Sequence, residues 1–241
     1  MTTIERPNEL AANASFELAA LELATNYRAA LVAEFSPHLR GRVVEVGAGE
    51  GHISERLRKV AGVDSLTSIE PDAALAKRFR ARLPDIELIE GTIDTLGRDQ
   101  ELDAIVSINV LEHIRDDESE LAKYAHLLRE RNGRLCLFVP ARQEIYAPID
   151  SDFGHHRRYA KPELERKLKT AGFELLAIDY FNLVGYFAWW LSFRVLKKRT
   201  FDANAVKLYD SVIFPIVHAL ETRVARPPIG QSLLVLARPT R

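Results

Sequence analysis

The sequence holds very little sulfur: Cys136 is the single cysteine, and Met1 is the single methionine among 241 residues. One cysteine excludes an internal disulfide and favours a reducing compartment, so we expect a cytoplasmic protein. The chain also has almost no net charge, because 33 basic residues nearly cancel 34 acidic ones. Nucleic-acid-binding proteins are usually visibly basic, so nucleic acid is not expected as a partner.

Long hydrophobic runs are missing as well. One stretch, residues 180–193 (YFNLVGYFAWWLSF), is free of charge and is followed by Lys197, Lys198 and Arg199. It is shorter than the roughly 20 apolar residues that span a bilayer. The first residues lack a basic segment followed by an apolar core, so we expect no signal peptide. These features predict a protein that does not span a membrane.

Short apolar runs alternate with helix-like stretches along the chain. Such alternation is typical of a parallel sheet with crossover helices, a doubly wound Rossmann-like α/β fold. We expect seven strands, mostly parallel, with the last strand antiparallel. The expected strands are residues 42–46, 66–70, 86–89, 103–108, 134–139, 173–181 and 231–237. The expected helices are residues 15–36, 52–60, 72–82, 117–130, 161–171 and 203–225.

Three glycines follow the first strand in the sequence VVEVGAGEGHIS, at Gly47, Gly49 and Gly51. In open α/β sheets a ligand binds beyond the carboxyl ends of the strands, where a glycine turn leads into a helix. The spacing G-x-G-x-G differs from the G-x-G-x-x-G of dinucleotide sites. Glu45 and Glu50 lie in or beside the turn and would repel a pyrophosphate. Their charges favour the ammonium and sulfonium groups of S-adenosylmethionine (SAM) over NAD.

Glu70 ends the second strand, at the distance from the glycines where an acid accepts hydrogen bonds from both ribose hydroxyls. This position suits NAD and SAM equally. It therefore predicts an adenosine-containing ligand without choosing between the two.

The ordered series VVEVGAGEGHIS, SIEPD, EGTIDTL, IVSINVLEHI and GRLCLFVP resembles the class I SAM-dependent methyltransferases. The later DSDFGHHRRY resembles a bacterial small-molecule branch of that family. The resemblance extends over roughly residues 25 to 240 and implies SAM as cofactor. The cofactor-binding residues that it implies are Tyr27, Glu45, Gly47, Ala48, Gly49, Gly51, Glu70, Pro71, Thr92, Ile93, Asp94 and Asn109.

Several of these positions keep alternatives. The family often has Gly-Asp after the third strand for the adenine amine, whereas here Thr92 follows Gly91 and the nearest acid is Asp94. Tyr27 either closes over the cofactor or faces the core as part of an amphipathic helix. Some family members bind magnesium through Glu-x-x-Glu-His. This chain keeps only Glu112 and His113 of that motif, so we expect no metal, because magnesium prefers oxygen ligands.

The loop after the fifth strand concentrates charged residues where an acceptor should lie. His155 is the first candidate for a general base and His156 the second, with Asp152 orienting either one. Arg157, Arg158 and Tyr159 are candidates for binding the acceptor. The alternative is that this loop braces a lid without any proton transfer.

The aromatic stretch adds Tyr186, Trp189 and Trp190 as candidates for binding the acceptor. It favours a lid over an apolar acceptor, with a dimer face, an interfacial anchor or core packing as alternatives.

We therefore predict one SAM-dependent methyltransferase domain over residues 1–241, with a helical cap from residues 1–38 and 180–228. The acceptor would be a small or lipid-like molecule, methylated most readily on oxygen. Alternatives are C- or N-methylation of a small aromatic molecule, or a non-catalytic protein that binds a partner. A membrane surface, contacted peripherally, and a second copy of the chain are further candidate partners.

Overall fold

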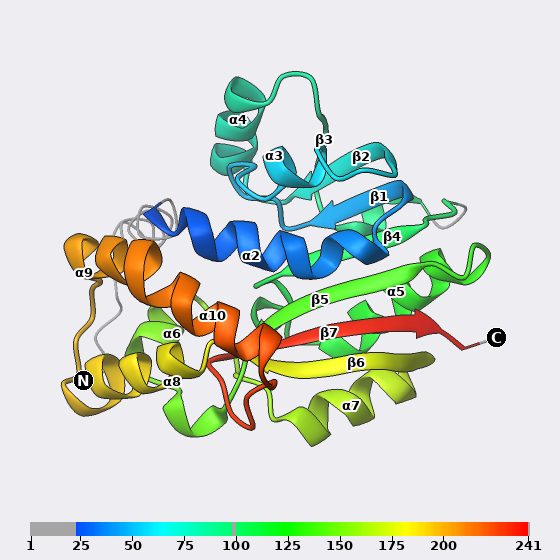
Figure 1. The fold of residues 1–241 in the computed structure, drawn as a ribbon. Coiled ribbons are helices and arrows are strands. Elements are labelled where there is room, and N and C mark those ends of the chain that lie inside the picture. Colours follow the sequence, from blue (N-terminus) through cyan, green and yellow to red (C-terminus); the bar gives the residue numbers. More distant parts are fainter. Residues whose placement is uncertain (1–22, 98–99, 241) are drawn as a thin grey trace, which may run out of the picture.

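The computed structural model describes residues 23–97 and 100–240 and contains one seven-stranded sheet in the order β3-β2-β1-β4-β5-β7-β6 (Figure 1). Strands β1 to β5 are parallel, and β7 runs antiparallel to both β5 and β6. The predicted Rossmann-like sheet with an antiparallel last strand is confirmed. The strands are β1 (Gly41–Val46), β2 (Val63–Glu70), β3 (Glu87–Glu90), β4 (Ala104–Ile108), β5 (Arg134–Pro140), β6 (Phe173–Phe181) and β7 (Ser232–Pro239).

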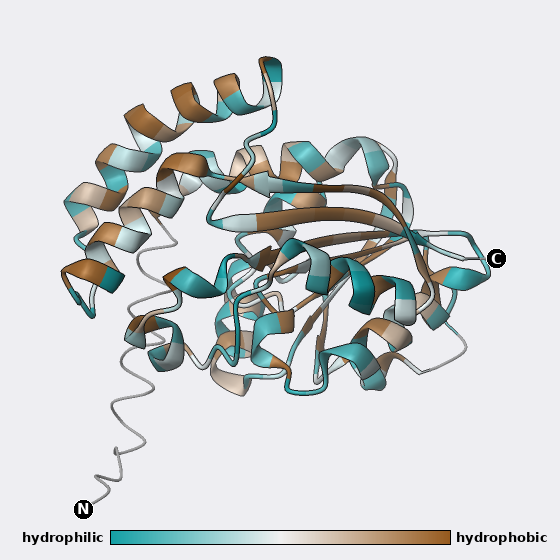
Figure 2. Cartoon of the chain, turned by 90° about the horizontal axis from the view of Figure 1, so that it is seen from below, coloured by the Kyte–Doolittle hydropathy of each residue, from teal (hydrophilic) through white to brown (hydrophobic). Residues whose placement is uncertain are grey.

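The central strands are hydrophobic on both faces because helices cover both faces, which Figure 2 shows as almost continuous brown ribbons. On one face, Leu121 and Leu128 of α5 (Asp117–Arg129) and Leu164 of α7 (Lys161–Thr170) join the core. On the other face, Leu31 of α2 (Thr25–Phe35) and Phe214 of α10 (Phe214–Arg223) complete a second core. The sheet thus forms the middle layer of three.

The remaining helices are short. They are α3 (Ser54–Leu57), α4 (Ala73–Arg82), α6 (Pro148–Asp152), α8 (Leu183–Trp189) and α9 (Ala203–Leu208), with 3₁₀ turns at Ser36–His38, Ile93–Leu96, Leu111–His113 and Gln143–Ile145. Two segments have π-type hydrogen bonding, Trp190–Val195 after α8 and Tyr209–Ile213 between α9 and α10. Pro215 has no N–H to donate to the preceding turn, which accounts for the irregularity before α10.

The structure shortens some predicted elements. The helix expected over residues 52–60 is the single turn α3, and residues before 23 in the expected first helix lie outside the described part. The loop expected after β5 contains the helical turn α6. The aromatic stretch begins in β6, turns at Asn182 with a positive φ of 66°, and continues as α8. Across residues 23–97 and 100–240, the helices are too short or too polar to cross a membrane.

Candidate functional site

The glycine turn connects β1 to α3 at the carboxyl edge of the sheet. Gly47, Gly49 and Gly51 have φ values of +73°, +56° and +85°, which side chains disfavour. A Cβ on Gly47 would lie 2.3 Å from Val110 Cγ2, and one on Gly51 would lie 2.6 Å from Leu83 Cδ1. A Cβ on Gly49 would meet nothing within 4 Å. Two glycines therefore let the protein pack on itself, and the third exposes the backbone to open space where a ligand can approach.

Glu70 lies beside this turn at the end of β2. One carboxylate oxygen accepts the amide of Gly49 at 2.7 Å, and the other accepts the amide of Asp72 at 2.9 Å. Burial raises the pKa of this carboxyl above its usual value. Each carboxylate oxygen can accept a further hydrogen bond, so Glu70 keeps capacity for two hydroxyl donors.

Glu45 lies beneath the turn and is almost fully buried, at 3 % exposed. Its carboxylate accepts hydrogen bonds from the hydroxyls of Ser54 and Ser68. Burial raises its pKa from 4.5 to about 7. Glu50, in the turn itself, forms an ion pair with Arg78 at 2.6 Å, which offsets the negative charge proposed there from the sequence.

The other predicted cofactor residues surround the same edge. Thr92 is exposed before a 3₁₀ turn in which Ile93 is buried, and the Asp94 carboxylate pairs with Lys123 Nζ at 2.6 Å. A contact between Asp94 and the adenine stays a prediction. Ala48 is buried and its amide donates to Ile69, whereas Pro71 is exposed.

Asn109 and Tyr27 border a large cavity at this edge. Asn109 follows β4 in a left-handed conformation, with φ of 53°. The ring of Tyr27 packs edge-on against Phe138 and Phe181, and burial raises the pKa of its hydroxyl. Tyr27 therefore packs against the core, as one alternative predicts, and also borders the cavity; its contact with the cofactor stays a prediction.

The cavity has a volume of about 460 Å³, within the range of small-molecule sites. Its floor consists of residues at the ends of β4, β5 and β7, and its walls come mainly from α8, α9 and the segments beside them. Most of this wall is apolar. The lining includes Tyr27, Asn109, Pro140, His155, Arg158, Trp189, Phe193, Phe201, Leu208, Tyr209, Ile213 and Ser232.

His155 is the histidine of the predicted catalytic loop that lines this cavity. It is 8 % exposed, and its Nδ1 lies 3.2 Å from Asp150 Oδ1. The same carboxylate accepts hydrogen bonds from Arg158 and from the Ala147 amide. Burial acts to raise the pKa of Asp150, but His155 and Arg158 outweigh it and hold that pKa below its usual value. The Arg158 guanidinium also stacks over the Trp189 ring at 4.4 Å.

The acid that contacts His155 is therefore Asp150 and not Asp152, which was expected from the sequence. Asp152 forms an ion pair with Arg199 instead. Residues two apart in a helical turn point to different sides, so only one of the two acids in α6 faces His155. The side chain of His156 is exposed, and its amide donates to Glu112.

Arg157 and Tyr159 attach the loop after β5 to Asp117 at the start of α5. Arg157 Nη1 lies 2.7 Å from Asp117, and the buried Tyr159 hydroxyl donates to the same carboxylate at 2.8 Å. Lys167 forms a third contact with Asp117. These contacts hold Arg157 and Tyr159 outside the cavity wall, away from the acceptor-binding role expected of them.

The aromatic stretch divides between inside and outside. Trp189 lines the cavity, whereas Trp190 is 44 % exposed on the outer side of the helix. Tyr186 packs against Phe187 and its hydroxyl lies 3.4 Å from Glu144, outside the cavity lining. Of the three predicted aromatic contacts, the structure brings one to the cavity.

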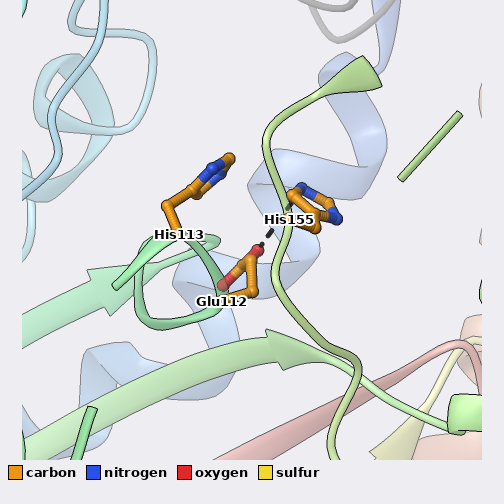
Figure 3. A group of neighbouring side chains, drawn as sticks. All are labelled: Glu112, His113 and His155. Carbon is orange, nitrogen blue, oxygen red and sulfur yellow. Dashed lines mark ion pairs between the residues drawn. The ribbon is translucent and has the colours of Figure 1, made fainter. Parts of the chain in front are cut away.

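Glu112, His113 and His155 converge beside the cavity (Figure 3). Their ligand atoms lie within 4.8 Å of one another, and His155 Nε2 lies 3.9 Å from a carboxylate oxygen of Glu112. Two imidazoles and one carboxylate do not suit magnesium, whereas such sets occur around zinc. The metal-free chemistry expected from the sequence stays a prediction.

The sequence profile of the methyltransferase domain matches residues 20–178, well over half of the chain. The chain therefore belongs to the methyltransferase-domain family. A search of curated proteins finds no match.

Solved structures share the fold along nearly the whole chain. A methyltransferase from Haloferax volcanii, in complex with the Trm112 methyltransferase activator, is 14% identical with a TM-score of 0.64, covering 99% of this chain and 100% of that chain. A SAM-dependent methyltransferase from Mesorhizobium loti is 20% identical with a TM-score of 0.58, covering 87% and 95%. Another from Clostridium acetobutylicum is 9% identical with a TM-score of 0.59, covering 90% and 92%.

Proposed function

We propose that this methyltransferase transfers a methyl group from SAM to a hydroxyl group of an amphiphilic acceptor held in the cavity. The observation that carries the proposal is the position of His155 in the wall of an apolar cavity of about 460 Å³, at the strand edge that holds the glycine turn. Val110, next to Asn109 in that wall, packs directly on Gly47. The cofactor turn and the acceptor cavity therefore share a boundary.

SAM is the cofactor of this methyltransferase, and the residues at the turn suit it. The open backbone at Gly49 allows close approach, and Glu70 has free lone pairs for ribose hydroxyls. Glu45 and Glu70 place two carboxyl groups near the turn, which favours a ligand carrying positive charge.

When bound, SAM supplies a methyl carbon bonded to a positively charged sulfur, which leaves as the neutral thioether S-adenosylhomocysteine. His155 Nε2 accepts the hydroxyl proton of the acceptor while the acceptor oxygen forms its bond to the methyl carbon. The Asp150 carboxylate accepts a hydrogen bond from Nδ1–H of His155 and so favours the tautomer in which Nε2 is free to accept a proton. Glu112, 3.9 Å from Nε2, stabilises the imidazolium that results. The remaining work is positioning.

The cavity wall limits the acceptor. Aromatic and aliphatic side chains, among them Trp189, Phe193 and Phe201, favour a molecule with a flat or aliphatic body. The lining also includes His155 and Arg158, whose polar groups favour an acceptor that carries a hydroxyl. Phenolic and polyprenyl-linked molecules combine these two features.

Isothermal calorimetry with SAM tests the cofactor site. We expect Glu70→Gln to weaken SAM binding by about 10- to 100-fold, because it replaces charge-assisted hydrogen bonds with neutral ones. Glu90→Gln is the matched control, since Glu90 ends the next strand but is exposed and pairs with Arg80. Equal SAM affinity in both variants, or binding of NAD in place of SAM, would contradict the assignment.

A further inference from the structure

The exposed apolar side chains of this protein gather on one segment. In the part of the chain that the structure describes, all large exposed hydrophobic residues except Leu23 and Leu176 lie between Phe187 and Val224. We call this set the apolar ridge. Its members are Phe187, Trp190, Leu191, Val195, Leu196, Leu208, Val212, Ile213, Ile216, Leu220 and Val224. Figure 2 shows hydrophobic residues recurring along the helices beside the sheet, at the left of the view.

Five members of the ridge have the spacing of one helical face. Leu208, Val212, Ile216, Leu220 and Val224 recur every fourth residue through α9, the π-type segment and α10, and such residues stack along one side. The opposite side faces the protein through Phe214. An unbroken apolar stripe on the outer side of a helix indicates a docking surface, because monomeric proteins rarely expose contiguous apolar patches of this kind.

The acidic residues of the same segment accept hydrogen bonds from backbone amides. Asp202 caps α9, Asp210 accepts the amides of Asn26 and Tyr27, and Glu221 accepts the amides of Asn182 and Leu183. Asp210 and Glu221 are buried. Two of the three acidic residues in this segment are thus inside the fold, and the third, Asp202, is exposed at the start of α9.

The basic residues stay outside. Arg194 lies in the π-type segment after α8, and Lys197 and Lys198 follow that segment. Lys207 and Arg223 lie on α9 and α10, and all five residues are exposed. An apolar face bordered by exposed cations is the pattern of helices that lie in the interface of an anionic bilayer. A protein partner or a second copy would supply its own charges and gives no reason for this segregation.

The acceptor cavity opens toward the same surface. Leu208 and Ile213 belong to the ridge, at 58 % and 38 % exposed, and both also line the cavity. Lys198, at the basic end of the ridge, lines it as well. A molecule leaving a bilayer in contact with the ridge would reach His155 without crossing open water.

We propose that the apolar ridge docks this protein onto the surface of an anionic lipid bilayer, with the cavity mouth facing the membrane. The docking does not depend on the proposed reaction. It can be measured without SAM, an acceptor or turnover.

The experiment measures binding of the full chain to vesicles of phosphatidylcholine, and to vesicles in which about a third of the lipid is phosphatidylglycerol. Sedimentation gives the bound fraction. Fluorescence reports insertion, because the chain has two tryptophans, of which Trp190 lies in the ridge. We expect binding to the anionic vesicles with a blue shift that Trp190→Phe removes.

Two double variants separate the contributions. Ile216→Glu with Leu220→Glu should weaken binding to the anionic vesicles at least about tenfold, because charges replace inserted side chains. Arg194→Gln with Lys197→Gln should weaken binding to the anionic vesicles by about 30-fold at low salt and leave binding to phosphatidylcholine unchanged. Leu176→Glu is the matched control, since Leu176 is 41 % exposed on β6, outside the ridge.

Wild-type protein that stays unbound to both vesicles overturns the proposal. The proposal is also overturned if the glutamate double variant binds the anionic vesicles as well as wild type and a thermal unfolding transition shows that it is folded. A dimer in light scattering that the glutamate variant dissolves, without vesicle binding, would assign the ridge to a second copy. If the glutamate variant does not fold, the charge variant and the Trp190 shift still decide the question.

Discussion

The buried carboxyl of Glu45 makes the stability of this protein depend on pH in an unusual direction. Its pKa rises from 4.5 to about 7 in the folded chain, because burial penalises the charged form more than Ser54 and Ser68 stabilise it. A rise of this size corresponds to about 3 kcal/mol.

The direction follows from which state holds the proton more tightly. Below pH 4.5 the carboxyl is protonated in the folded and the unfolded chain, and its contribution to stability is fully present. As the pH rises, the unfolded chain releases the proton first, so the free energy of unfolding falls. The loss of about 3 kcal/mol is complete once the pH has passed about 7.

Glu45→Gln removes this titration and keeps the shape of the side chain. We expect the variant to match wild type near pH 5 and to be more stable by up to about 3 kcal/mol at pH 8. Urea unfolding followed by circular dichroism at a series of pH values measures the difference. Asp64→Asn, an exposed carboxyl on β2, should follow the wild-type profile. Parallel profiles for Glu45→Gln and wild type would refute the reasoning.

Two further predictions concern the catalytic loop and the glycine turn. His155→Asn should lower kcat by at least about 100-fold with little change in KM, because it removes the proposed base, whereas His156→Asn should change kcat little. Methyl transfer from labelled SAM to a phenolic acceptor measures kcat of both variants. A larger loss of kcat in His156→Asn than in His155→Asn would assign the base to His156. Gly51→Ala should lower the free energy of unfolding by about 1–3 kcal/mol, because its Cβ would lie 2.6 Å from Leu83 and 2.9 Å from Phe79 with φ at +85°. A free energy of unfolding equal to that of wild type would show that α4, which carries Phe79, can shift to make room for the added Cβ.

The fold follows from local patterns in the sequence. Strands such as β5 are short continuous runs of buried apolar residues, and the glycines after β1 mark the turn at which helix α3 begins. Such signals lie within a few residues of one another. This is why the sheet and the position of the glycine turn could be predicted from the sequence.

The loop proposed to be catalytic depends on geometry that a sequence does not show. Asp150 and Asp152 look like equivalent candidates in the sequence, because both shortly precede His155. Their different positions around the turn of α6 decide that Asp150 faces His155. Tyr159 is directed inward by Asp117, which lies 42 residues away in the chain. Trp189 and Trp190 are neighbours, but one residue of helical rotation places the first in the cavity and the second on the surface.

Two buried carboxylates link helices that are far apart in the sequence. Asp210 accepts amides at the start of α2, and Glu221 accepts amides at the start of α8. The segment that carries the ridge therefore supplies the N-terminal hydrogen bonds of both helices, which contribute Tyr27 and Trp189 to the cavity. A shortened relative without this segment would lose the hydrogen bonds that Asp210 and Glu221 accept from α2 and α8, together with the apolar ridge. The shape of the cavity and the exposed apolar ridge therefore depend on the same segment.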